Sequence, residues 1–207
     1  MAEYFDKYER EMTISGRHPG SPAPIPTREE LHQALVCRHT GAVQRHLSRA
    51  WVAMAGLGGL GSNIAIFLAR IGVGHLHLID FDRVDITNLN RQQYFIHQIG
   101  MAKTEALSEI LLAINPYLTI QKDAVRITKE NVPALFQNDT YICEAFDVPE
   151  NKAMLAEAVL EHFPENTSLP PAVWLAMGTV TQSVQEKSLR IFISVGMKLR
   201  KSARAAV

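Results

Sequence analysis

The stretch Ala55–Asn63, AGLGGLGSN, carries four glycines in six positions and lies between two apolar segments. The preceding segment, WVAMA, has the length and composition of a buried strand, and Ser62–Gly72 has those of an apolar helix. A glycine-rich turn between a strand and a helix is the setting of the dinucleotide-binding fingerprint. The stretch therefore predicts a phosphate-bearing ligand at a helix N-terminus.

Each glycine of the fingerprint has a physical role. Gly56 permits the tight turn, Gly58 lets the main chain come close to phosphate, and Gly61 lets the helix pack against the strand. With Gly59 they are the candidate nucleotide-binding glycines. The pattern indicates a nucleotide without saying which one.

Strand-like and helix-like segments alternate along the rest of the chain. Strands are expected at residues 75–80, 118–125, 140–146 and 172–177, and helices at 101–114, 131–137 and 150–163. This alternation predicts an α/β fold, a doubly wound, mostly parallel, Rossmann-like sheet with helices on both faces.

Three regions are expected in the chain: a polar N-terminal arm over residues 1–26, a nucleotide-binding domain over 27–176, and an atypical tail over 177–207. Thr27 and Glu30 form a capping-box pattern, which predicts a helix to about Val36, and a second short helix is expected over residues 40–49. The domain would thus carry an N-terminal helical extension.

The composition argues against nucleic-acid binding, a cysteine zinc site and a membrane-spanning protein. The formal net charge is zero, so no bulk field favours nucleic acid or an acidic membrane. Two cysteines cannot form a four-cysteine zinc site, and no zinc is expected. The chain also has no apolar stretch long enough to span a bilayer, so a cytoplasmic location is expected.

The loop DFDRVDITNLNRQ, residues 80–92, bears on the choice of nucleotide. Asp80 ends a strand, where a carboxylate can accept hydrogen bonds from ribose hydroxyls of either NAD or ATP. Arg91, together with Lys103 at the start of the next helix, would neutralise a triphosphate and stabilise a leaving pyrophosphate. Asp147, which ends a later strand, could hold Mg²⁺. This set favours nucleotidyl transfer over hydride transfer.

Five blocks in order, AGLGGLGSNIA, LIDFDRVDITNLNRQ, GMAK, INP and EAFD, resemble the ThiF/MoeB family of sulfur-carrier adenylyltransferases, which are related to ubiquitin-activating enzymes. The resemblance covers roughly residues 38–157, and NLNRQQY and EAFD are most similar to the ThiF branch of thiamine biosynthesis. It implies that Asp80 binds ribose, that Asn88, Arg91 and Lys103 bind the phosphates, and that Asp147 binds magnesium.

The resemblance implies ATP-dependent adenylylation of the C-terminal carboxylate of a small ubiquitin-like carrier protein, by a homodimer. Two alternatives remain open. One is a nucleotide- or carrier-binding module with impaired catalysis, because the tail after Ala176 departs from the family. The other is an NAD(P)-dependent oxidoreductase, which rests on the glycines alone.

The tail suggests a change of reading frame just before Met177. Codon degeneracy allows residues 177–181 to be read as GYGD in another frame, and residues 189–197 as ENLYICGD, both similar to the ThiF branch. We expect sequencing of the gene to show these second-frame readings. A gene without them would establish the tail as a genuine divergent sequence.

Overall fold

The structure is a computed structural model that describes residues 24–163, 172–176 and 190–194. Most of the predicted arm and most of the predicted tail therefore lie outside the described residues. The chain forms two compact units that divide between His46 and Leu47.

The first unit contains the predicted helical extension. Helix α2, Arg28–Val36, begins at a capping box, in which the Glu30 amide donates to Thr27 Oγ1 at 3.2 Å and the Thr27 amide donates to Glu30 Oε2 at 2.7 Å. The hydrogen bonds that the Thr27 amide and hydroxyl donate to Glu30 Oε2 lower the pKa of the Glu30 carboxyl. Helix α3, Gly41–Arg49, follows and runs across the boundary between the units.

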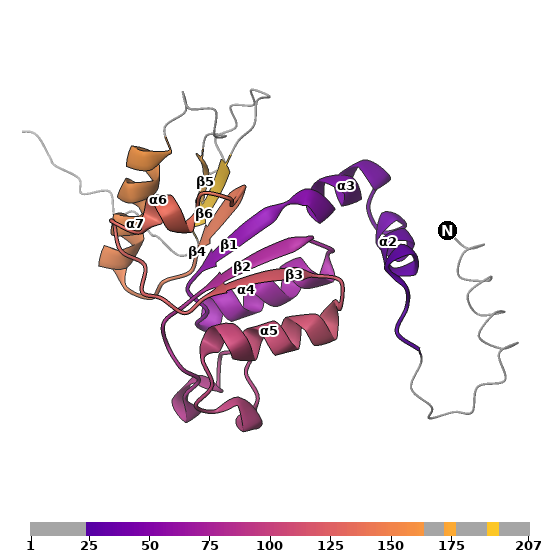
Figure 1. Ribbon diagram of the computed structural model, residues 1–207, viewed down its shortest axis with the longest axis horizontal. Coiled ribbons are helices and arrows are strands. Elements are labelled where there is room, and N and C mark those ends of the chain that lie inside the picture. The colour runs from indigo at the N-terminus through magenta and orange to yellow at the C-terminus, as the bar shows by residue number, and fades with distance from the viewer. Residues whose placement is uncertain (1–23, 164–171, 177–189, 195–207) are drawn as a thin grey trace, which may run out of the picture. The chain divides into compact units, whose positions relative to one another are not determined.

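The second unit is built on a six-stranded parallel sheet with the order β3-β2-β1-β4-β6-β5 (Figure 1). Its strands are β1 Trp51–Ala55, β2 His75–Ile79, β3 Thr119–Asp123, β4 Tyr141–Glu144, β5 Ala172–Ala176 and β6 Arg190–Ser194. Parallel pairing brings the carboxyl ends of the strands to one edge of the sheet, where a ligand is expected in a doubly wound fold.

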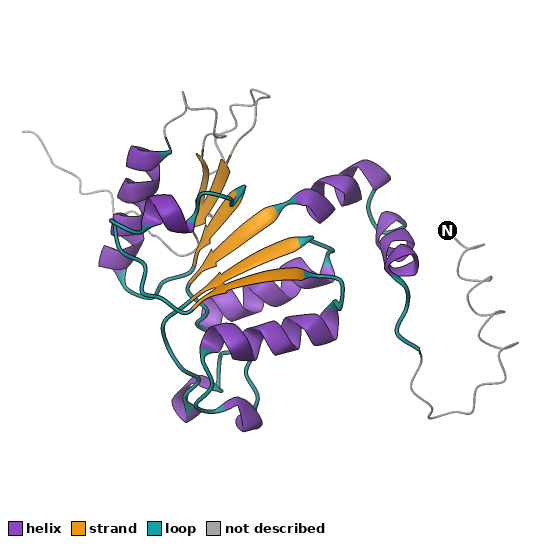
Figure 2. Cartoon of the chain, in the orientation of Figure 1, coloured by secondary structure: helices purple, strands orange, loops and turns teal. Residues whose placement is uncertain are grey.

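Helices cover both faces of this sheet (Figure 2). Successive strand residues point to opposite faces, so β1 sends Val52 and Met54 into one core and Ala53 and Ala55 into the other. Helices α4 Gly59–Arg70 and α5 Lys103–Ile114 close the first core, and α6 Val132–Leu135 and α7 Pro149–His162 close the second. The predicted doubly wound, Rossmann-like fold is confirmed.

Two features of the second unit differ from the sequence-based expectation. Strand β6, between β4 and β5, was not expected, because its residues lie inside the basic segment interpreted as an atypical tail. The connection from β2 to α5 also contains two single 3-10 turns, Ile86–Asn88 and Ile96–Gln98. Such short turns lack the apolar periodicity that makes a helix visible in a sequence.

A buried histidine joins three segments on the α6 side of the sheet. His77 of β2 contacts Asp139 through Nδ1 at 2.8 Å and Asp123 of β3 through Nε2 at 2.7 Å. Burial by itself would lower the pKa of His77, but the hydrogen bonds and charges of Asp139 and Asp123 outweigh it and raise that pKa. The two carboxylates therefore favour the protonated form of the His77 imidazole.

This cluster predicts a pH-dependent free energy of unfolding. A histidine whose pKa is raised on folding stabilises the protein fully below its unfolded pKa, near 6.5, and this contribution is lost as pH rises through the folded pKa. We expect chemical denaturation of the wild type to show a free energy of unfolding that falls as pH rises above 6.5, and we expect His77→Asn largely to remove this fall.

Asp139→Asn provides a milder variant, which should shift the fall to lower pH, and the exposed His97→Asn is the matched control. Parallel stability profiles for the wild type, His77→Asn and Asp139→Asn would contradict a raised pKa of His77 in the folded protein.

Candidate nucleotide-binding site

The glycine-rich loop leaves β1 in a conformation that requires glycine at its first position. Gly56 has φ of +97°, and its amide donates to the Ile79 carbonyl at 2.9 Å. A Cβ at this position would lie 3.1 Å from the Ala145 carbonyl oxygen. The loop is thus held closely between the chains leaving β2 and β4.

The first turn of α4 presents main-chain amides without a competing cap. Gly58 is the N-cap residue, and no side chain makes a capping hydrogen bond there. A Cβ on Gly61 would lie 1.9 Å from the Gly56 carbonyl oxygen, so this turn can pack on the loop only with glycine. The unsatisfied N–H groups and the positive end of the helix dipole form an anion-binding site.

Asp80 connects the end of β2 to this loop. Its buried carboxylate accepts the Leu57 amide at Oδ2, 2.7 Å away, and the Asp82 amide at Oδ1, 2.8 Å away. Each oxygen keeps a further lone pair, since a carboxylate has about four acceptor positions. The role of Asp80 in ribose binding stays a prediction, and its role in fixing the loop is an addition from the structure.

Two cations of the predicted set flank the loop. Lys103 begins α5 and is buried, with Nζ 2.8 Å from Asp82 Oδ2 and 4.0 Å from Asp80 Oδ2. Arg91 is exposed, and its side-chain methylenes lie 3.3 to 3.5 Å from the position of a Cβ on Gly59. One positive charge is therefore fixed beside Asp80, and the Arg91 side chain lies over the glycine loop, with its Nη1 donating to Asn90 Oδ1 at 3.1 Å.

Asp147 completes the site from the turn after β4. It is exposed, and its Oδ2 lies 3.9 Å from the position of a Cβ on Gly58. Within the described ranges, no cluster of three or more histidine, cysteine, aspartate or glutamate residues could hold a metal. A single accessible carboxylate beside a phosphate site is nevertheless suited to Mg²⁺, which commonly takes one or two protein carboxylates plus phosphates and waters.

Among the contacts of the described residues, Asn88 joins the site only through its main chain. Its carbonyl accepts the amides of Arg91 at 3.2 Å and Gln92 at 3.0 Å, which shapes the turn that carries Arg91. The structure thus brings together the four glycines, Asp80, Arg91, Lys103 and Asp147, and no contact places the Asn88 side chain against them.

Sequence reasoning missed two polar side chains that hold the loop. Asn63 donates from Nδ2 to the carbonyls of Gly59 at 2.5 Å and Arg91 at 3.3 Å, so it ties α4 to the Arg91 turn. The buried Tyr94 hydroxyl donates to the Leu57 carbonyl at 2.8 Å. Both lie inside the quoted motifs, AGLGGLGSN and NLNRQQY, which was the available signal.

A buried ion pair supports the turn that carries Asp147. Glu144 of β4 accepts Lys152 Nζ at 3.0 and 3.2 Å, and its Oε1 also accepts the Phe146 amide at 2.6 Å. Breaking such a pair leaves an uncompensated buried charge, so both partners are needed to keep the turn in place. The neighbouring Cys143 is also buried, and burial, followed by the Glu144 charge, raises its pKa to about 12.

The sequence profile of the ThiF family matches residues 31–182. The chain belongs to the ThiF family. This membership agrees with the resemblance seen in the five sequence blocks. Among the described residues of this ThiF-family chain, no helix has both the length and the apolar character needed to cross a membrane.

Named relatives match a little more than half of the chain. The sulfur carrier protein adenylyltransferase of Thermus thermophilus is 32% identical over 126 residues, which are 58% of this chain and 46% of that protein. The adenylyltransferase and sulfurtransferase uba4 of Aspergillus terreus is 35% identical over 120 residues, 56% of this chain and 24% of that one. The chain thus spans less than half of the length of either relative.

A similar solved structure carries a nucleotide. The E. coli tRNA N6-threonylcarbamoyladenosine dehydratase, in complex with ATP, superimposes with a TM-score of 0.62 at 27% identity. The match covers 67% of this chain and 58% of the dehydratase. The ThiF-type fold is therefore shared with a protein that binds ATP.

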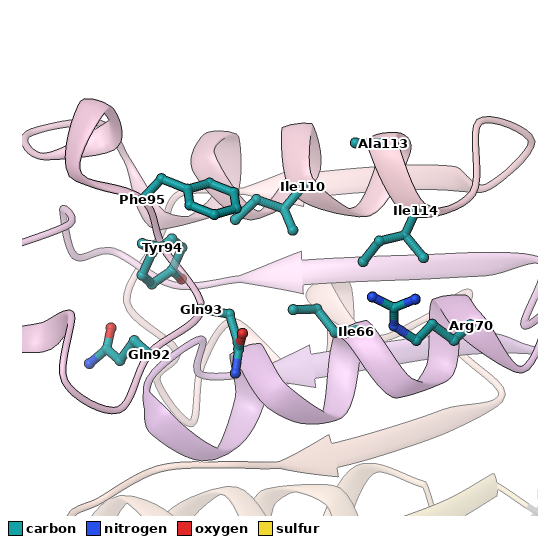
Figure 3. Close-up of a pocket in the computed structure, with 9 residues that line it drawn as sticks. All are labelled: Ile66, Arg70, Gln92, Gln93, Tyr94, Phe95, Ile110, Ala113 and Ile114. Atoms are coloured by element: carbon teal, nitrogen blue, oxygen red, sulfur yellow. The ribbon is translucent and has the colours of Figure 1, made fainter. Parts of the chain in front are cut away.

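A pocket of about 360 Å³ lies away from this site, between α4 and α5 (Figure 3). Ile66, Ile110 and Ile114 line it, Arg70 lies at one end, and residues 92–95 lie at the other. None of the predicted site residues lines the pocket. We therefore take the glycine loop, at the carboxyl edge of the sheet, as the candidate site. The pocket is not the candidate site, because it contains none of these residues.

Gly58 and Gly61 should differ in how well they tolerate an added methyl group. Gly61→Ala places a Cβ 1.9 Å from the Gly56 carbonyl, and we expect it to destabilise the fold by several kcal/mol, on the order of 3. Gly58→Ala meets only Asp147 Oδ2 at 3.9 Å, so it should fold normally but bind ATP weakly, because its methyl group occupies the space of a phosphate.

Thermal denaturation and ATP titration of both variants measure these effects. A stable Gly61→Ala protein, or a Gly58→Ala protein with unchanged ATP affinity, would refute the assigned geometry.

Proposed function

We propose that this ThiF-family chain adenylylates the C-terminal carboxylate of a small ubiquitin-like sulfur-carrier protein at the expense of ATP. The observation that carries the proposal is the arrangement of Lys103, Arg91 and Asp147 around the first turn of α4. A hydride-transfer site has no need of two cations and a free carboxylate at the phosphates. The oxidoreductase alternative, which rested on the glycines, receives no support from the family or the relatives named above.

The reaction is a displacement at phosphorus. A carboxylate oxygen of the carrier attacks the α-phosphorus of ATP, a carboxyl-oxygen-to-phosphorus bond forms, and the bond to the bridging oxygen breaks. Pyrophosphate leaves with the bonding electron pair, and the products are an acyl-adenylate and pyrophosphate. No proton needs to move, so this chain contributes position and charge.

Different site residues would supply the position and the charge. The amides of the α4 first turn would hold a phosphate by hydrogen bonds, and Lys103 is already fixed beside Asp80 and Asp82. Arg91 can turn toward the phosphates from its place over Gly59 and stabilise charge that grows on the leaving group. No side-chain nucleophile is required, consistent with a Cys143 thiol that stays protonated.

Magnesium would be held through Asp147, whose accessible carboxylate lies beside Gly58. When bound, the ion supplies neutralising charge on the phosphate oxygens. The Glu144–Lys152 pair fixes the turn that presents this carboxylate.

We further propose the sulfur carrier of thiazole synthesis as the substrate, because NLNRQQY and EAFD resemble the ThiF branch. A second candidate is a carboxylate linked to tRNA, which the likeness to the E. coli dehydratase favours. With either substrate, ATP would activate a carboxylate. The two candidates differ in whether a carrier protein or a tRNA must be added before pyrophosphate exchange occurs. The zero net charge of the chain favours the protein substrate.

Exchange of labelled pyrophosphate into ATP tests the function. We expect exchange that depends on a carrier ending in Gly-Gly and on magnesium. Arg91→Ala should lower its rate by two or more orders of magnitude, about 3 kcal/mol of transition-state stabilisation, and Asp147→Ala should abolish it with the fold intact. Arg70→Ala, at the far end of α4, and Glu150→Ala, at the start of α7, are matched controls.

The outcomes separate the candidates. Exchange with tRNA but not with a carrier would favour the dehydratase-like function. Binding of ATP without exchange would favour the impaired binding module. Wild-type exchange rates in Arg91→Ala or Asp147→Ala would show that these residues are assigned wrongly.

A further inference from the structure

An exposed aromatic–cation pair joins the exits of β2 and β3. The guanidinium carbon of Arg126 lies 3.9 Å from the centroid of the Phe81 ring. Both residues are exposed, and half of the Phe81 surface is open to solvent. A large ring exposed at a strand end, with a cation stacked on it, is available for a flat ligand.

The main chain of both residues is held in place. Asp80 Oδ1 accepts the Asp82 amide at 2.8 Å, which fixes the turn with Phe81 at its centre. The Arg126 carbonyl accepts Asn131 Nδ2 at 2.9 Å, and Asn131 Oδ1 accepts the Thr128 amide at 2.9 Å. These bonds hold the two turns from which the Phe81 and Arg126 side chains extend toward each other.

The pair lies where the base of a bound nucleotide would reach. The phosphates belong at the first turn of α4, and Asp80 is the proposed ribose ligand, in contact with Leu57 of the loop. β3 lies on the side of β2 away from β1, so a nucleotide that extends beyond Asp80 passes toward β3 (Figure 1). Phe81 follows Asp80 directly, and Arg126 follows the end of β3, whose Asp123 carbonyl accepts the Asp80 amide at 3.3 Å.

We propose that Phe81 and Arg126 form the stacking platform for the purine base of the nucleotide. This proposal rests on the proposed function and assigns its base specificity. Phenyl rings and guanidinium planes both stack on the faces of bases. Stacking contacts the face of a base and not its edge. The platform therefore binds purine triphosphates more tightly than pyrimidine triphosphates and discriminates only weakly between adenine and guanine.

Binding measurements on the full chain test the platform. ATP, CTP and inorganic triphosphate, which lacks a base, are titrated calorimetrically into the wild type, Phe81→Leu and Arg126→Gln. Each substitution should weaken ATP binding about ten-fold, reduce the preference for ATP over CTP, and leave the affinity for inorganic triphosphate unchanged. Phe67→Leu and Arg70→Gln, which alter an exposed phenylalanine and an exposed arginine of α4, should change none of the three.

The probes separate failure of the platform from failure of the proposed function. A wild type that binds neither ATP nor inorganic triphosphate would overturn both. Tight ATP binding by the wild type and equally by Phe81→Leu and Arg126→Gln would overturn the platform alone. Equal losses of affinity for ATP and for inorganic triphosphate in these variants would also overturn the platform, because the two side chains would then act through charge or folding.

Discussion

The contact between Gly61 and the carbonyl oxygen of Gly56 sets the position of the groups around the glycine loop. With no space for a side chain there, the first turn of α4 packs directly on the loop leaving β1. Leu57 can then donate its amide to Asp80, and Arg91 can lie over Gly59. One close approach between two backbones thus aligns groups that are far apart in the sequence.

The charges of the site are arranged before any ligand binds. Lys103 is buried beside Asp82 and Asp80, so its ammonium group is ion-paired and positioned during folding. Arg91 and Asp147 stay exposed and lie next to Gly59 and Gly58, respectively. A fixed cation with two accessible, oppositely charged groups limits the reorganisation that binding a charged ligand requires.

Local sequence patterns predicted most of the fold and part of the site. The glycine fingerprint and the alternation of apolar segments depend on neighbours along the chain, so β1 to β5 and helices α2 to α7 were expected near their observed bounds. Tertiary partners were not visible. Lys152 resembles an ordinary helix-surface lysine until packing brings it to the buried Glu144.

Asn63 and β6 are two further features whose tertiary partners could not be read from the sequence. Besides Gly59, the amide of Asn63 has partners on a loop more than 25 residues away, and no local pattern reveals those contacts. β6 lies in a stretch whose composition departs from the family, and only pairing with β4 and β5 defines it as a strand.

The place of β6 has a consequence for biosynthesis. β5 pairs with no strand of the described sheet except β6, and β6 also covers the open side of β4. A nascent chain that has emerged only as far as residue 176 therefore exposes one edge of β4 and both edges of β5. Unpaired parallel strands are slow to find their partners, and their edges associate with other chains. Newly made protein thus depends on residues 190–194 to close the sheet, although all the proposed nucleotide-binding residues have by then been synthesised.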